Sequence, residues 1–190
     1  RYTDLKSIVS YVDLCEVRDT DSGGNMPTKV KIKIKDNSEL RREIDELYEK
    51  TNQVDLAKWS LLMAKHILDI VDIDCHSVDE IVNGFKVNEL WQTGEAGIHD
   101  VRQAGFRIHK VARESDSEIK KTALRVFGQA VGSGHMKEHA MVASDYAIKV
   151  INLMFPDNIE AVTKERKWQL VALEQTAKPL GGLIFWILIK

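Results

Sequence analysis

The chain has 190 residues, which is the size of one globular domain or of two small ones. Hydrophobic residues make up 44% and charged residues 29%, and with only three prolines and eleven glycines the collagen-like and low-complexity classes are excluded. The formal net charge of -2 argues against broad binding to nucleic acid or to an anionic membrane, because both need a clear basic surplus.

The two ends of the chain predict a small β element. Residues 28–35, TKVKIKIK, alternate Lys with Val or Ile, which is typical of a strand with one apolar face. Residues 7–19 can form a helix, but residues 12–17 are also compatible with a strand, and the loop 19–28 can close a hairpin between that strand and residues 28–35. At the other end, a pair of glycines precedes the apolar, strand-length run 183–190, LIFWILIK. We expect the terminal segments to form a small antiparallel sheet against one side of a helical bundle.

The middle of the chain predicts one helix after another. Ser38 is expected to cap the first, ELRREIDELYEK, and Asp55 the second, LAKWSLLMAKHILDIV. The second is apolar around most of its circumference, so it should be a central, largely buried helix. Ser77 and Glu80 form an S-x-x-E capping box before a third helix.

Four further helices follow a break at Gln92-Thr93-Gly94. An amphipathic stretch covers residues 98–112, and Ser115 with Glu118 forms a second capping box ahead of the next helix. Small residues then crowd together in GQAVGSGH, residues 128–135. Glycine is unfavourable inside a helix, so this run predicts a close backbone approach to a neighbouring helix.

The last two helices complete a bundle. KEHAMVASDYAIKVINLMF is expected to end before Pro156, and Asp157 with Glu160 should cap the final one. The chain is therefore predicted to be mainly α, a single-domain helical bundle of about seven helices with a small β element formed by the terminal segments. The expected divisions are an N-terminal extension at 1–36, the helical bundle at 37–178 and an apolar C-terminal tail at 179–190.

Cysteine usage and hydropathy point to the cytoplasm. Cys15 and Cys75 have no CxxC spacing and no further partners, which favours two reduced thiols over a disulfide framework or a zinc site. The longest uninterrupted apolar run, 183–189, is far shorter than the roughly 20 residues that span a bilayer. We expect a cytoplasmic protein with no membrane partner.

Two histidines spaced by four residues, His135 and His139 in GHMKEHA, are the most suggestive candidates for chemistry. On one continuous helix this spacing puts both rings on one face, as in the H-E-x-x-H metalloproteases. Met136 follows the first histidine, so the general-base glutamate of that motif is absent. A turn at this point, favoured by Gly134, would remove the shared face. We expect structural histidines and no metal; if one is bound, His135 and His139 are the candidate ligands.

Basic residues gather in two places. The lysines of residues 28–35 are expected on a solvated edge face. The sequence TKERKW, residues 163–168, places three basic residues beside Trp168 and can contact phosphate. The acidic neighbours Glu160 and Glu165 weaken that field, so a core or interface role is predicted for Trp168 and no nucleic-acid partner is expected.

Four segments occur together in one order. The first is LAKWSLLMAKHILDI, and the second is VRQAGFRIHKVARES, which contains the pattern R-x-A-x-x-x-x-H-x-x-A-R with His109 at its centre. The third, VFGQAVGSGHMKEHAMVASDYAIKV, combines small residues, two histidines four apart and a Tyr-Ala-x-Lys ending, and the fourth is ERKWQ. On these segments the chain resembles, over residues 38–173, a family of immunity proteins of bacterial polymorphic toxin systems.

The resemblance implies a non-catalytic binder that neutralises a cognate bacterial toxin by covering its active site, with no cofactor. A rigid helical face with a complementary patch suffices for this, without a reaction centre. The candidate polar cluster consists of His109, His135, His139, Tyr146 and Lys149. Exposed residues near the two close histidines, together with the acidic turn 72–80, are the candidate contact face.

Two other functions remain open. One is a metal-dependent hydrolase that uses His135 and His139 with a carboxylate from another helix. The other is a homo-oligomeric scaffold, for example a homodimer, in which residues 28–35 or 183–190 pair across subunits.

Overall fold

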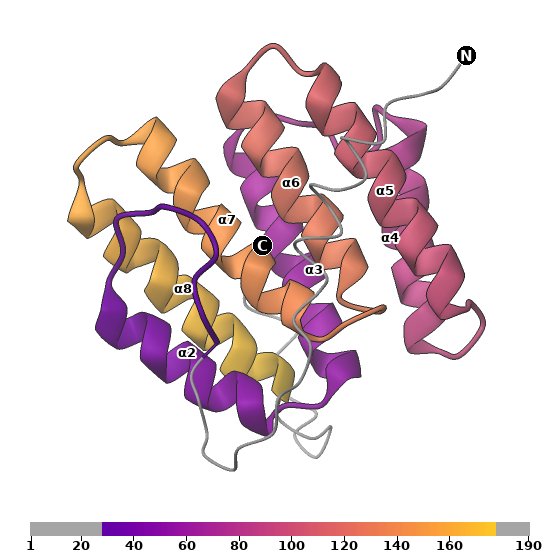
Figure 1. The fold of residues 1–190 in the computed structure, drawn as a ribbon, viewed down its shortest axis with the longest axis horizontal. Helices are drawn as coiled ribbons and strands as arrows, with labels where there is room; N and C mark the ends of the chain where they lie inside the picture. Colours follow the sequence, from indigo (N-terminus) through magenta and orange to yellow (C-terminus); the bar gives the residue numbers. More distant parts are fainter. Residues whose placement is uncertain (1–27, 178–190) are drawn as a thin grey trace, which may run out of the picture.

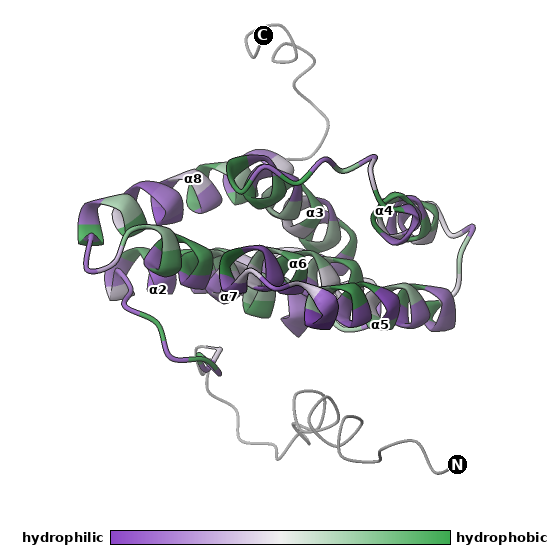
Figure 2. Ribbon diagram, turned by 90° about the horizontal axis from the view of Figure 1, so that it is seen from above, coloured by the Kyte–Doolittle hydropathy of each residue, from purple (hydrophilic) through white to green (hydrophobic). Residues whose placement is uncertain are grey.

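The computed structural model describes residues 28–177, and these form seven helices and no strand (Figure 1). The helices are α2 Ser38–Lys50, α3 Gln53–Ile70, α4 Asp79–Gln92, α5 Ile98–Glu114, α6 Glu118–Gly132, α7 Glu138–Met154 and α8 Ile159–Ala177. Figure 2 shows α8, α3 and α4 in one layer and α7, α6 and α5 in the other, while α2 packs against α8 at one edge. The predicted mainly α bundle is confirmed.

The core lies between the two layers. As predicted, α3 is the central helix, and it packs against α4, α6, α7 and α8. Its side chains Trp59, Met63 and Ile67 are fully buried. The close helix approach predicted from the small residues is also confirmed, because a Cβ on Gly105 of α5 would lie 3.3 Å from the carbonyl oxygen of Gly128 on α6.

The predicted helix caps are wrong by one to three residues. The side chains that accept first-turn N–H groups belong to Asn37, Asn52, Ser117 and Asn158, and not to Ser38, Asp55, Ser115 and Asp157. The N-cap of α4 is Val78, which makes no side-chain cap bond, so the capping box at Ser77 does not form. Several cap-type residues lie side by side at each start, and the one that takes the extended backbone conformation is selected by the path of the incoming chain.

The strand predicted in residues 28–35 is wrong, and its alternation of buried and exposed side chains holds only in part, because Val30 is exposed. Ile32 and Ile34 are half-buried against the bundle, while the lysines between them are exposed. The backbone N–H of Lys35 donates to Oδ1 of Asn152 on α7 at 2.7 Å, and its carbonyl accepts from Nδ2 of the same amide at 3.0 Å. Side chains of the bundle therefore take the backbone groups that a neighbouring strand would have paired.

We call residues 28–37 the N-terminal strap. The other predicted β segments, 12–17 and 183–190, lie outside the described residues. No helix within residues 28–177 is long and apolar enough to cross a bilayer.

Candidate functional site

Three of the predicted site histidines come together where α5, α6 and α7 meet. His109 lies on α5, His139 on the first turn of α7 and His135 in the turn that joins α6 to α7. The rings of His135 and His139 meet edge to face with their centroids 6.0 Å apart. The two histidines do not share the face of one helix, because α6 ends at Gly132 and α7 begins only at Glu138. They come close because His135 lies in the turn between these helices.

Two glycines of α6 make room for the histidine rings. A Cβ on Gly128 would lie 2.7 Å from Cε1 of His109, and a Cβ on Gly132 would lie 3.2 Å from Cδ2 of His139. The rings therefore rest directly against the α6 backbone, where any larger residue would push them away. The small-residue run that predicted a helix–helix approach thus also positions the histidines.

Burial keeps these histidines neutral. Burial above all, together with neighbouring basic groups, lowers the pKa of both His109 and His139 to about 4. The pKa of His135 is also lowered, first by burial and then by Arg102. Nδ1 of His139 lies 2.5 Å from Oε1 of Gln129, and an amide oxygen can only accept, so this nitrogen carries the proton.

Basic side chains of the described residues lower the pKa values of the three histidines. Arg113 and Arg125 act on His109, Arg102 acts on His135, and Lys31 of the strap acts on His139. We call the surface around the α5–α6–α7 junction the histidine face, and it consists of Arg102, His109, Arg113, Arg125, His135 and His139. Its potential is therefore positive although its histidines are uncharged.

The two candidate metal ligands, His135 and His139, have no third ligand beside them in the described part of the chain. Within residues 28–177, no group of three or more His, Cys, Asp or Glu side chains is placed to hold a metal ion. The carboxylate that a hydrolase would need beside His135 and His139 is therefore not found in that part of the chain.

Tyr146 and Lys149 do not join the histidines. Both lie farther along α7, where Tyr146 is buried and Lys149 is half-buried. Within the described residues, no hydrogen bond or ion pair connects either side chain to His109, His135 or His139. Of the five predicted residues, the structure brings the three histidines together, and it shows no such bond from them to Tyr146 or Lys149 within residues 28–177.

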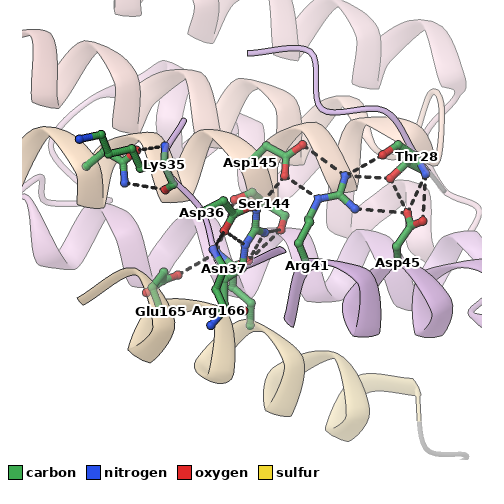
Figure 3. Close-up of polar contacts among 12 residues, drawn as sticks. Thr28, Lys35, Asp36, Asn37, Arg41, Asp45, Ser144, Asp145, Glu165 and Arg166 are labelled. Atoms are coloured by element: carbon green, nitrogen blue, oxygen red, sulfur yellow. Dashed lines mark hydrogen bonds and ion pairs between the residues drawn. The ribbon is translucent and has the colours of Figure 1, made fainter. Parts of the chain in front are cut away.

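A buried ion-pair network is centred on Asp145 of α7, and the sequence did not predict it (Figure 3). The guanidinium of Arg166 on α8 is fully buried and donates to Oδ1 of Asp36 at 2.9 Å and to Oδ1 of Asp145 at 2.9 Å. Arg41 on α2 donates to the same carboxylate of Asp145 at 2.8 Å, and Asp45 accepts from the backbone of Thr28. The network joins the strap, α2, α7 and α8.

The network corrects the interpretation of the basic run at 163–168. Arg166 was grouped there with Lys164 and Lys167 as a phosphate contact, but it points inward while the two lysines are exposed. Trp168 is half-buried, as a core or interface residue, and its ring stacks on His66 of α3 at a centroid distance of 3.8 Å. The signal for this network in the sequence is Asp145, a carboxylate in the middle of a largely apolar helix.

A comparison with known protein families identifies the family of this chain. The family described as Imm-5 like putative immunity protein matches residues 46–176. The chain belongs to this family. The matched range contains the whole histidine face, with α6 and its glycines, and begins after the strap. No curated protein and no solved structure matches the chain.

Proposed function

We propose that this Imm-5 like protein binds a protein toxin in the cytoplasm and neutralises it without catalysis, by covering the toxin's active site. The family match over residues 46–176 carries the proposal, because it assigns most of the chain to a family of immunity proteins.

The roles of the histidines support a binder. Two of them are buried, and the proton of His139 Nδ1 is donated to Gln129, so the side chains hold α5, α6 and α7 together. Their low pKa values keep them neutral near pH 7, where a general base would be poised for proton transfer only with a pKa near that pH. The site can therefore act through its shape and through the positive charge of its arginines.

A titration of the toxin tests this function. Purified full-length protein is added to the toxin encoded beside it, and the remaining toxic activity is measured against the molar ratio. A binder reaches full neutralisation near a one-to-one ratio and forms a complex of that composition on size-exclusion chromatography. The same titration with a chelator present is the control, and it should be unchanged.

Two results would contradict the proposal. One is the absence of any complex with the toxin. The other is full neutralisation at a small fraction of the toxin concentration, which would indicate an enzyme that modifies the toxin or its target.

A further inference from the structure

Charge is unevenly distributed between the two layers. Residues 98–132, which form α5 and α6, contain seven Lys or Arg against four Asp or Glu. Residues 71–97, which lead into and form α4, contain one Lys against six Asp or Glu. Figure 2 shows α4 and α5 in opposite layers, so one side of this end of the molecule is basic and the other is acidic.

The arginines of the basic side have no acidic partner in the described part of the chain. Arg41, Arg42 and Arg166, which lie elsewhere, each form an ion pair. The four arginines of α5 and α6 form none with any Asp or Glu of residues 28–177, and Arg102 lies instead over the ring of Phe106 at 5.5 Å. Three of these four, Arg102, Arg113 and Arg125, belong to the histidine face.

The geometry of the face suits carboxylates. Arg102 and Arg113 are eleven residues apart on α5, which corresponds to about 16 Å along the helix. An extended segment of about five residues spans that distance. Guanidinium groups bind carboxylates with two parallel hydrogen bonds. Beside the arginines, Nδ1 of His135 is buried without a hydrogen-bond partner among residues 28–177.

We propose that the histidine face binds an acidic, extended segment of a protein partner; this inference rests on the proposed function, under which the partner is the toxin. A protein is favoured over nucleic acid because the chain as a whole carries a net charge of -2 and its acidic α4 side would repel a long polyanion. Short carboxylate segments interact with the arginines alone.

The first experiment uses a synthetic peptide of six glutamates as the probe and the full-length protein. Histidine ring signals are followed by NMR while the peptide is added at low salt. We expect the signals of His109 and His135 to shift. The double variant Arg113→Glu/Arg125→Glu should bind the peptide at least tenfold more weakly, because both reversed charges repel it.

The matched control is Arg107→Glu, which reverses an exposed arginine of the same helix about 120° around the axis from Arg113. It should change the peptide affinity less than twofold. Unfolding temperatures of all variants establish that they are folded. Equal weakening by the control, unshifted histidine signals, or tighter binding of a six-nucleotide single strand at this face would overturn the inference.

The second experiment repeats the affinity measurements with the toxin encoded beside the protein. We expect the double variant to lose at least tenfold in affinity and the Arg107→Glu control to retain it. If the toxin binds the wild type and the double variant equally, the inference fails while the proposed function stands. If the peptide results hold but the toxin does not bind at all, the proposed function fails while the acidic-segment site stands.

Discussion

The contact between His109 and Gly128 shows how narrowly single residues define the site. The imidazole ring occupies the space that a side chain on residue 128 would fill, and the same relation holds for His139 and Gly132. Interiors are close-packed, so one added methyl group must displace a ring or a helix. The positions of the two histidine rings thus depend on the missing side chains of Gly128 and Gly132.

Gly128→Ala tests this packing. Alanine favours a helix over glycine by about 1 kcal/mol, but the overlap with His109 should outweigh that gain and lower the free energy of unfolding by about 1–2 kcal/mol. Urea unfolding measures the change. In a His109→Ala background the same substitution should become neutral or stabilising, and an equal loss in both backgrounds would contradict the packing argument.

Acid should weaken the fold through His109. Its pKa is about 4 in the folded protein, against 6.5 for an unperturbed histidine, with Arg113, Arg125 and His139 as its charged or titratable neighbours. Between these values the unfolded chain binds a proton that the folded chain does not, so the contribution is complete above pH 6.5 and declines as the pH falls towards 4.

The measurement is urea unfolding at pH 7 and pH 4.5. For His109→Gln the fall in the free energy of unfolding between these two pH values should be smaller than for the wild type by about 2 kcal/mol. An identical fall in both proteins would show that His109 is not buried as the structure has it.

At the scale of elements, the buried ion-pair network determines where the strap and α2 lie. Asp36 of the strap and Asp145 of α7 share the guanidinium of Arg166, while Arg41 of α2 approaches Asp145 from the other side. Removing one member of a buried pair is costly, because the remaining charge stays desolvated. The network should therefore contribute more to the orientation of these elements than surface ion pairs do.

Arg166→Met is the matching test. It removes the central cation of the network, and we expect the free energy of unfolding to fall by about 3 kcal/mol. Lys164→Met, an exposed change within the same helix, is the control and should stay within about 0.5 kcal/mol of the wild type. Similar effects of the two variants would show that Arg166 is not buried.

At the scale of the whole molecule, both layers share one hydrophobic cluster. It contains fully buried side chains from opposite ends of the bundle, including Ile44 of α2, Trp59 of α3 and Phe127 of α6. A second, smaller cluster contains Ile148, Ile151 and Val162. A main core that both layers share gives small domains a cooperative, all-or-none unfolding transition. The bundle should accordingly behave as one unit despite its two charged sides.

The expected result is one unfolding transition for all probes. Helical circular dichroism and tryptophan fluorescence should give the same urea midpoint. The variants Trp91→Phe and Trp168→Phe each remove one fluorescent side chain, on α4 and on α8 respectively. Within each variant, circular dichroism and fluorescence should again give the same urea midpoint. Two separate midpoints would show that the α4–α5 end unfolds independently of the α2–α8 edge.

The sequence by itself determined the helices, the central position of α3 and the family resemblance. Helical periodicity is a local property, because residues three and four apart share a face whatever surrounds them. The glycine run likewise predicted a close approach, since glycine has few other reasons to persist in a helix. The alternation in residues 28–35 predicted that Ile32 and Ile34 face the bundle, although Val30 of the same pattern is exposed.

Only the tertiary structure decided how these elements are joined. Asn152 binds the backbone of Lys35 at the end of the segment predicted as a strand, and Arg166 turns inward because Asp36 and Asp145 meet it there. His135 reaches His139 through a turn between two helices, and His109 comes to them from α5. Each of these contacts joins residues that are distant in the sequence. Local sequence patterns do not determine such contacts, because they form only when the two layers of helices pack together.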